Sequence, residues 1–331
     1  MSETIRFGIV GTSSITEKFL DGSNHVKDFS LTAVYSREES KARDFAKKYG
    51  AENIFTDLEK MAKSDLIDAV YIASPNAMHA KQAEVFLKNK KHVLCEKAFA
   101  SNVEEVNKMI SVSKENKMVL MEAMKTEYLP GFFAVKENLH RIGKVRKYFG
   151  NYCQYSSRYD KFKQGIVLNA FKPELSNGSI MDIGVYCIHP MVYLFGEPNK
   201  LKANAVLLES GVDGEGSILF NYDNMEAVVM YSKITNSRVS SEIQGEEGNI
   251  VIDNINTFEK VKIVFRNGEE EDLSRVHIED NMCYELEEFI RLVKEQDTKK
   301  ALQRLKVSKS VMEIMDEARK QIGLVFPADK N

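Results

Sequence analysis

The first 120 residues alternate short apolar runs with stretches of helical periodicity, and this alternation constrains the fold more than any other feature. Five of the runs suit strands, and they are residues 6–10, 31–35, 69–73, 92–95 and 118–121. Helical spacing of apolar residues marks the stretches between them, among them residues 40–49, 80–89 and 102–115. Strands that alternate with helices pair in parallel, with helices covering both faces of the sheet. We therefore predict an N-terminal α/β domain with a parallel sheet.

The pattern changes near residues 122–128, where the regular alternation stops. After one helical stretch at about 131–141, strand-like runs dominate, at residues 145–156, 201–209, 216–222, 227–233, 240–244 and 261–265. Turn signals separate several of these runs, at Asp213-Gly214, Tyr222-Asp-Asn224 and Asn267-Gly268. Two late helices are expected at about 281–295 and 301–322. We predict the parallel α/β domain over residues 1–123 and an α+β domain with a large, mostly antiparallel open sheet over residues 124–331.

The composition is that of an ordinary globular protein, because 43% of the 331 residues are hydrophobic and 29% are charged. The formal net charge is −3 and no long basic run occurs, which argues against nucleic acid or an anionic membrane as the main partner. The four cysteines lack zinc-site spacing, and free thiols suit a reduced compartment. No signal peptide is evident, and no apolar run approaches the ~20 residues that span a bilayer. We expect a cytoplasmic protein without a metal site, bound to neither nucleic acid nor membrane.

Polar side chains follow two neighbouring strands of the predicted parallel sheet. The residues concerned are Ser74, Pro75, Asn76 and His79 after the first strand, and Glu96 and Lys97 after the second. In an open parallel sheet, ligands bind just outside the carboxyl ends of the strands. These side chains should therefore gather at one crevice, where a nucleotide cofactor and its substrate would meet. We expect His79 to fix the loop beside the cofactor.

A glycine-containing turn joins the first strand to the first helix, in the sequence Gly8-Ile-Val-Gly11-Thr-Ser13-Ser-Ile-Thr16. Glycines in such a turn let the backbone approach a pyrophosphate at the helix N-terminus. Ser13 stands where the dinucleotide fingerprint has a glycine, so close approach is poorer, although the serine still offers its amide and its hydroxyl. A tight turn without a ligand would look similar. The predicted cofactor contacts are Gly8, Gly11, Thr12, Ser13, Ser14 and Ile15.

The end of the second strand bears on the choice between NAD and NADP. A carboxylate at this place would bind the ribose 2′-hydroxyl of NAD. This chain instead has Ser36 and Arg37, and an arginine can pair with a 2′-phosphate while the serine donates a hydrogen bond. We therefore predict a preference for NADP. The alternative is a solvated Arg37, with Glu38 or Glu39 turning inward to accept NAD.

Four segments, in this order and spacing, resemble the glucose–fructose oxidoreductase / inositol dehydrogenase (Gfo/Idh/MocA) family over essentially the whole chain. They are residues 8–16, 74–79, 92–97 and 178–189. Within the family, the chain most resembles the NADP-dependent branch that includes the dimeric dihydrodiol and D-xylose dehydrogenases. The resemblance implies a Rossmann domain, and a second domain whose open sheet forms a homodimer or a higher homo-oligomer. NADP(H) is the expected cofactor, with NAD(H) as the alternative.

The same resemblance implies three catalytic residues. Lys97 matches the lysine of the family's Glu-Lys-Pro motif, Asp182 matches an aspartate near a helix start, and Tyr186 matches the general acid/base. Each has a simpler interpretation: Lys97 as a surface lysine, Asp182 as a helix cap, and Tyr186 as a core tyrosine. Some relatives have histidine in place of this tyrosine, and His189 lies one further turn along. His189 and Arg158 are weaker candidates for contacting the substrate, since His189 can equally pack in the core.

These residue types suit the oxidation of a carbinol, which loses a hydride to the nicotinamide and a proton from the hydroxyl. A tyrosine with a free pKa of ~10 is a poor base at neutral pH, and a nearby ammonium favours the phenolate. Lys97 could supply that charge and orient the substrate oxygen. Asp182 could bind a neighbouring hydroxyl or hold Lys97 in place.

The chain departs from the family motif at Ala98, which stands where the family has proline after the lysine. That proline commonly follows a cis peptide bond, and cis bonds are rare before other residues. Either the fold imposes a cis bond here, or the loop around Lys97 differs locally. We predict an NAD(P)-dependent oxidoreductase that acts on a hydroxyl or carbonyl of a sugar, polyol or cyclic diol. The alternative is a non-catalytic nucleotide- or sugar-sensing protein on the same fold.

Overall fold

The computed structural model describes residues 4–330, which form two compact units. Unit 1 runs up to Lys125 and also includes Ile278–Lys309, whereas unit 2 combines Thr126–His277 with the residues from Ser310 onward. The first boundary lies close to the predicted one, but residues 278–309 belong to unit 1 and not, as predicted, to the second domain. They return to unit 1 because helix α9 (Cys283–Lys294) packs on its first strand, where the ring of Phe289 lies 5.8 Å from that of Phe7.

Unit 1 contains a doubly wound parallel sheet. Its strands are β1 (Ile5–Val10), β2 (Phe29–Tyr35), β3 (Asn53–Phe55), β4 (Ala69–Ile72), β5 (His92–Glu96) and β6 (Leu120–Ala123). They lie in the order β3-β2-β1-β4-β5-β6, and every pair is parallel. The order reverses between β1 and β4, which is the switch point where ligands bind in such sheets. The predicted Rossmann architecture is therefore confirmed.

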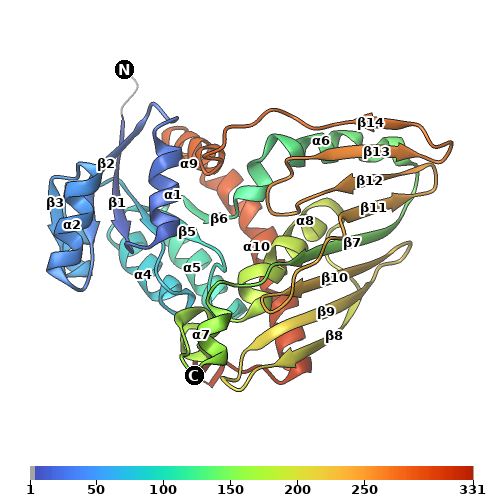
Figure 1. Ribbon diagram of the computed structural model, residues 1–331. Helices are drawn as coiled ribbons and strands as arrows, with labels where there is room; N and C mark the ends of the chain where they lie inside the picture. The colour runs from blue at the N-terminus through green and yellow to red at the C-terminus, as the bar shows by residue number, and fades with distance from the viewer. Residues whose placement is uncertain (1–3, 331) are drawn as a thin grey trace. The chain divides into compact units, whose positions relative to one another are not determined.

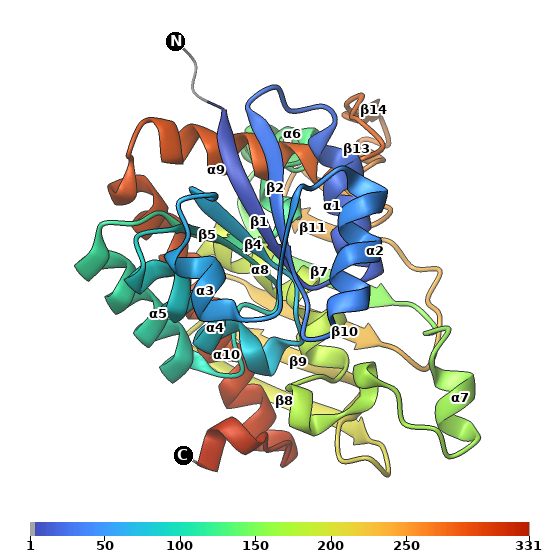
Figure 2. The same ribbon diagram turned by 90° about the vertical axis from the view of Figure 1, so that its left-hand side faces the viewer.

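Helices cover both faces of this sheet, as Figure 2 shows, with α1 and α2 on one side and α3, α4 and α5 on the other. Their bounds are α1 (Ser14–Ser23), α2 (Glu39–Tyr49), α3 (Leu58–Lys63), α4 (Asn76–Lys88) and α5 (Val103–Asn116). Strand β4 is buried along its whole length, as expected for a strand covered on both faces.

Strand β6 begins later than predicted, because Lys117 ends α5 in the left-handed conformation and the Met118 amide donates a hydrogen bond to the Ser113 carbonyl.

Unit 2 contains an eight-stranded open sheet (Figure 1). Its strands are β7 (Val145–Cys153), β8 (Lys200–Leu207), β9 (Asp213–Asn221), β10 (Glu226–Ser232), β11 (Ser241–Gly245), β12 (Gly248–Ile252), β13 (Val261–Phe265) and β14 (Glu270–Asp272). They lie in the order β14-β13-β12-β11-β7-β10-β9-β8. Strands β7 and β10 pair in parallel, and the other described pairs are antiparallel. This confirms the prediction of a large, mostly antiparallel sheet.

Turn chemistry located two of the three predicted hairpin connections. The turns after β9 and β13 contain Tyr222-Asp-Asn224 and Asn267-Gly268, as predicted. The third prediction was wrong, because Asp213 and Gly214 open strand β9. The chain reverses earlier, where the Leu208 amide bonds the Val212 carbonyl and Gly211 adopts a φ of +89°.

Helical segments of unit 2 contact one face of this sheet. They are α6 (Pro130–Asn138), α8 (Val185–Phe195), the 3₁₀ turn η2 (Leu139–Ile142) and the π-helical turn η5 (Ile180–Gly184). The other helical segments are α7 (Tyr159–Lys163) and the 3₁₀ turns η1 (Lys125–Tyr128), η3 (Asn169–Phe171), η4 (Pro173–Leu175) and η6 (Pro327–Lys330). Helix α10 (Thr298–Ile322) begins in unit 1 and continues into unit 2. Along β10, Val229 and Tyr231 are buried while Met230 between them is exposed, so one sheet face packs on helices and the other is open.

One helical run qualifies for a membrane span by length and composition, which corrects the expectation that none approaches that length. It covers Pro173–Phe195, and 72% of its most apolar window is buried inside the protein. A buried core helix passes the same test, and this run includes α8, which packs on β7 and β10.

Candidate active site

The turn between β1 and α1 fits the dinucleotide cradle that the sequence predicted. Gly11 has a φ of +106°, and a Cβ there would lie 2.5 Å from the Ala73 carbonyl oxygen, so only glycine suits this position. Thr16 is buried, and its Oγ1 donates a 3.0 Å hydrogen bond to the Gly11 carbonyl. Ser13 is the N-cap of α1, yet its side chain makes no capping hydrogen bond. Backbone amides at a helix N-terminus suit an anion, and the contact of Ser13 with a cofactor phosphate stays a prediction.

The other predicted residues of this turn occupy different positions. Thr12 and Ile15 are half-buried and Ser14 is exposed, at the start of α1. Gly8 lies inside β1, where an added Cβ would meet the Met61 and Ile67 side chains at 2.2 and 3.2 Å. Core packing is therefore sufficient reason for glycine at position 8, and its cofactor contact stays a prediction.

Arg37 follows the end of β2 and is exposed to solvent. The two carboxylates that could take its place are engaged by lysine and arginine of α2, where Glu38 pairs with Lys41 at 2.7 Å and Glu39 pairs with Arg43 at 2.6 Å. The Ser36 hydroxyl accepts a 3.3 Å hydrogen bond from the Glu38 amide, which shapes the turn. Within residues 4–330, the Arg37 guanidinium has no ion-pair partner. This geometry favours a 2′-phosphate over a free ribose hydroxyl at this place.

The loops after β4 and β5 are tied together by His79. Its Nε2 lies 2.8 Å from the Ser74 carbonyl oxygen and its Nδ1 lies 2.9 Å from the Ala98 carbonyl oxygen. Burial lowers the pKa of the ring, and a neutral imidazole donates to one of these carbonyls at a time. His79 thus joins the two loops as expected, and its place beside the cofactor stays a prediction.

The other predicted residues of these two loops have the following positions. Asn76 opens α4 after Pro75, and the Ser74 hydroxyl donates a 2.6 Å hydrogen bond to Gln82. The Lys97–Ala98 peptide bond is cis.

Glu96 anchors the segment that carries Lys97. Its carboxylate is 5% exposed and accepts hydrogen bonds from the Tyr71 hydroxyl at 2.7 Å and the Lys97 amide at 3.2 Å. The Tyr71 ring stacks on Phe19 of α1 with centroids 3.7 Å apart. Glu96 is thus bound to the interior of unit 1, and it holds the end of β5 rather than presenting a charge at the surface.

A second buried carboxyl, that of Glu285, lies in the same interior. Glu285 belongs to α9, is 0% exposed, and neither of its oxygens has a hydrogen-bond partner within the described residues. Burial, together with the charge of Glu96, raises the pKa of Glu285 well above its ordinary value. Lys125 is a nearby cation, and burial lowers its pKa. Burial and the charge of Glu96 thus both favour the protonated form of Glu285.

Replacing Glu285 with glutamine should stabilise the protein at neutral pH. The unfolded chain releases this proton near the ordinary glutamate pKa of 4.5, whereas the folded protein keeps it. The wild type therefore loses stability as the pH rises from about 4.5 to the folded-state pKa, by up to ~1.4 kcal/mol per pH unit. The neutral amide lacks this loss, so the advantage of Glu285→Gln should grow with pH. Urea unfolding at several pH values measures it, with exposed Glu287→Gln as the control. An advantage that is constant with pH would contradict a protonated Glu285.

In unit 2, Asp182 is paired with a buried lysine that the sequence analysis did not single out. The Asp182 Oδ2 lies 2.7 Å from the Nζ of Lys233, which directly follows β10. The amides of Ser179 and Ile180 bond the Asp213 carboxylate at 3.0 and 2.7 Å, so the structure gives the capping of this helix start to Asp213. Burial raises the pKa of Asp213 to about 6, against the lowering effect of those two amides.

Tyr186 and His189 share α8 but differ in environment. The Tyr186 ring packs edge-on against Tyr152 of β7, with centroids 5.7 Å apart, and it is partly exposed. His189 is 1% exposed, its Nε2 lies 3.8 Å from Glu127, and burial lowers its pKa to about 3. These are the surroundings of a neutral core histidine, so its contact with the substrate stays a prediction. Arg158 is the exposed N-cap residue of α7, and its substrate contact is likewise untested.

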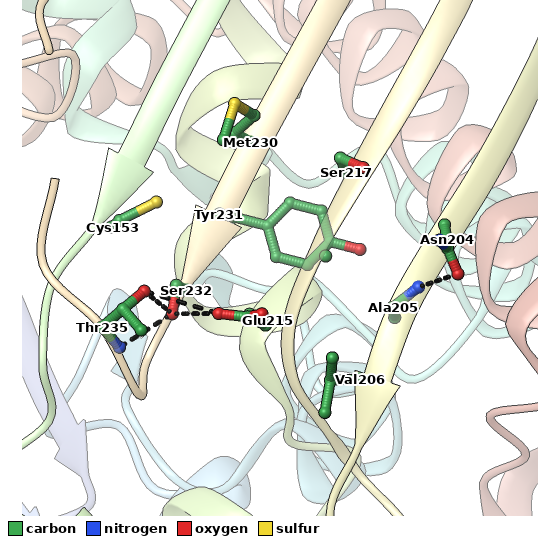
Figure 3. Close-up of a pocket in the computed structure, with 11 residues that line it drawn as sticks. Cys153, Asn204, Ala205, Val206, Glu215, Ser217, Met230, Tyr231, Ser232 and Thr235 are labelled. Carbon is green, nitrogen blue, oxygen red and sulfur yellow. Dashed lines mark hydrogen bonds between the residues drawn. The ribbon is translucent and has the colours of Figure 1, made fainter.

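Unit 2 also has a hollow of about 230 Å³ over strands β8, β9 and β10, which Figure 3 shows. None of the predicted site residues lines it. Its lining consists of Cys153, Asn204, Ala205, Val206, Glu215, Gly216, Ser217, Met230, Tyr231, Ser232 and Thr235. Glu215 accepts weak 3.4 Å hydrogen bonds from Ser232 and Thr235 at its edge. The described residues contain no cluster of three or more histidine, cysteine or acidic side chains that could hold a metal ion.

Two family models match the chain in succession. The model described as "Oxidoreductase family, NAD-binding Rossmann fold" matches residues 5–124, and the model of the GFO/IDH/MocA C-terminal domain matches residues 138–251. Together they cover most of the chain and correspond to β1–β6 of unit 1 and the first part of unit 2.

Known proteins of similar length resemble nearly the whole chain. The scyllo-inositol 2-dehydrogenase (NADP(+)) IolU of Bacillus subtilis is 54% identical over 326 residues, covering 98% of this chain and 99% of that protein. The trans-1,2-dihydrobenzene-1,2-diol dehydrogenase of Danio rerio is 27% identical over 98% of this chain and 99% of that protein. The solved 3-ketoreductase KijD10 of Actinomadura kijaniata, in complex with NADP and TDP-benzene, matches with a TM-score of 0.84 at 21% identity, covering 97% of this chain and 98% of that one. The fold, the two family models and the full-length relatives agree, and the chain is a member of the Gfo/Idh/MocA oxidoreductase family.

Proposed function

We propose that this protein is an NADP-dependent oxidoreductase acting on the CH–OH group of a polyol or sugar, with cyclic polyols of the inositol class as the first substrates to test. The observation that carries this is the 54% identity, over 98% of the chain, to a scyllo-inositol 2-dehydrogenase. The Gly11 cradle and the presence of Lys97, Asp182 and Tyr186 support it. Free cysteines within the described residues also suit a cytoplasmic location.

In the proposed reaction, Tyr186, Lys97 and Asp182 each have a separate role. When bound, the nicotinamide takes or returns the hydride. The Tyr186 hydroxyl exchanges the proton of the substrate hydroxyl, because a phenol can act as a general acid or base. The Lys97 ammonium stabilises negative charge on the oxygen that loses its proton. Asp182 accepts a hydrogen bond from a neighbouring substrate hydroxyl and thereby orients the ring.

A panel of cyclic polyols and sugars, assayed with NADP and NAD, tests this function directly. We expect reduction of NADP, followed by nicotinamide absorbance, with at least one cyclic polyol and much less with NAD. The competing interpretation is a non-catalytic protein that senses a nucleotide or sugar. It predicts ligand-dependent thermal stabilisation without turnover in either direction. If only a ketone substrate is turned over, with NADPH, the protein is still an oxidoreductase, and it acts as a reductase.

Replacing Arg37 with alanine should weaken NADP binding by about 1.5–3 kcal/mol, the range for hydrogen bonds to charged groups. This corresponds to a roughly 10- to 150-fold higher Kd. The NAD affinity should stay nearly unchanged, because the 2′-phosphate is the group that Arg37 is expected to contact. Titration calorimetry with both cofactors measures this, with the exposed Lys47→Ala in the following helix α2 as control. Equal losses for both cofactors would place Arg37 outside the 2′-phosphate site.

We also propose that the open face of the unit 2 sheet forms a homodimer. Val228 of β10 is paired with Leu219 of β9 and Phe149 of β7, so these three side chains form one row across the sheet. Leu219 is 56% exposed, and Met230 and Val206 on the same face are 42% and 50% exposed. Apolar surface of this kind on a globular protein usually marks an interaction site.

Replacing Leu219 with arginine should dissociate this dimer. A charge placed in the centre of an apolar interface has no partner, and its burial costs several kcal/mol, so the dimer Kd should rise by about 100-fold or more. Sedimentation velocity at micromolar concentration measures the change. Val276→Arg is the control, because Val276 is 99% exposed and lies outside the sheet. A wild type that sediments as a monomer would end the dimer proposal.

A further inference from the structure

Lys233 is a buried lysine with three defined contacts inside unit 2. Its side chain is 2% exposed, and its ammonium lies 2.7 Å from Asp182 Oδ2. It also donates a 3.2 Å hydrogen bond to the Ala170 carbonyl and lies 5.1 Å from the centre of the Phe171 ring. A lysine is almost never buried to this degree unless its charge is paired. These contacts therefore fix the ammonium at one place.

Two carboxylates act on this ammonium, and they differ in what they can still bind. Asp213 is completely buried and bonds the amides of Ser179 and Ile180, so it serves the start of the helix. Asp182 keeps 36% of its side chain exposed while it pairs with Lys233. A carboxylate has about four lone-pair sites, so Asp182 can accept a hydroxyl hydrogen bond and the ammonium at the same time.

We propose that Lys233 is a positioning residue for the reaction. It holds the Asp182 carboxylate in the orientation that accepts a hydrogen bond from a substrate hydroxyl next to the reacting carbon. The same ammonium ties the Ala170–Phe171 segment to that carboxylate. This inference rests on the proposed function, because it requires that Asp182 contacts the substrate. Lysine suits the task because its three N–H donors can serve Asp182 and the Ala170 carbonyl together.

Two neutral replacements of similar size distinguish the effect of the Lys233 hydrogen-bond donors from the effect of its side-chain volume. Lys233→Met removes every donor, and Lys233→Gln keeps an amide that can donate to Asp182. Lys233→Met should raise the KM for the polyol about 10- to 100-fold, the range for loss of a hydrogen bond to a charged group, with a smaller fall in kcat. Lys233→Gln should recover a substantial part of that KM. The Kd for NADPH should stay within about twofold in both, because Lys233 acts through a substrate-binding residue.

A double-mutant cycle with Asp182 tests whether Lys233 acts through that carboxylate. Asp182→Asn/Lys233→Met should have nearly the same KM as Asp182→Asn alone, since the orientation of a missing carboxylate no longer matters. A merely structural lysine would instead give multiplied effects and a lower melting temperature without the KM-selective loss. Lys262→Met is the control, because Lys262 forms an exposed ion pair with Glu270 in the same unit. Its KM should match the wild type.

The outcomes separate this inference from the proposed function. If the wild type turns over no polyol or sugar, the function fails. If the wild type is active but Lys233→Met and Lys233→Gln both keep a normal KM, the positioning role alone is overturned. Multiplied KM effects in the double mutant overturn it as well. If Lys233→Met does not fold, Lys233→Leu, which also lacks a donor, takes its place in the comparison with Asp182→Asn, and equal KM values support the role whereas multiplied values reject it.

Discussion

Replacing Tyr186 with phenylalanine should reduce turnover by ~10²–10⁴-fold, the usual contribution of a positioned general acid or base. Phenylalanine keeps the ring that packs against Tyr152 and removes the hydroxyl that exchanges the proton. Cofactor affinity should survive, because the change leaves the β1–α1 turn untouched. Steady-state kinetics with a substrate from the polyol panel and a separate NADPH titration measure the two quantities. The wild-type oxidation rate should rise toward alkaline pH, and Tyr186→Phe should lose that rise.

Tyr193→Phe is the matched control for this change. Tyr193 lies on the same helix, and its hydroxyl accepts a hydrogen bond from Lys136 at 3.2 Å, so it tests the loss of a phenol from α8 as such. Its turnover should stay near that of the wild type. Near-normal turnover of Tyr186→Phe would remove the tyrosine from the mechanism. His189 is a poor replacement, because burial lowers its pKa to about 3 and leaves a weak base at neutral pH.

Sequence patterns located the elements that bury apolar side chains and missed the short ones. Strands β1, β2, β4 and β5 are apolar runs bounded by polar residues, and their helices show a clear apolar face. The missed elements are β3, α3, α7, β12 and β14, which span between three and six residues. A run of that length cannot show a period, so its structure is set by the neighbours with which it pairs. The strand order of unit 2 depends on pairings between distant segments, which no local pattern encodes.

The candidate site divides in the same way into residues that local patterns locate and residues that they miss. The rule that ligands bind at strand ends placed Ser74 and Lys97 at adjacent loops, and His79 joins those loops in the structure. Glu285 and Lys233 were missed because each becomes significant only through burial. Glu285 reaches the interior of unit 1 on a helix that returns from far along the chain. A lysine directly after an apolar strand was the available signal for Lys233, but an exposed strand end gives the same pattern.

Replacing Lys97 with methionine should damage turnover about as much as loss of the Tyr186 hydroxyl, by ~10²–10⁴-fold. Methionine has nearly the length of lysine and no charge, so the negative charge on the reacting oxygen would lack its stabilising ammonium. The structural anchors of this segment should persist, because Glu96 bonds the Lys97 amide and His79 lies 2.9 Å from the Ala98 carbonyl, and neither contact uses the lysine side chain. Unchanged thermal stability, measured alongside kinetics, checks this.

The Lys97→Met/Tyr186→Phe double mutant decides whether the two residues serve one proton transfer. If they do, the double mutant should be little worse than the worse single mutant, because a step that is already lost cannot be lost again. Lys88→Met, at the exposed end of α4, is the control for removing a lysine charge from unit 1, and it should leave turnover near that of the wild type. Multiplied losses in the double mutant would mean that the lysine and the tyrosine contribute to separate steps. In that case Lys97 would bind the substrate or the cofactor independently of the proton that Tyr186 exchanges.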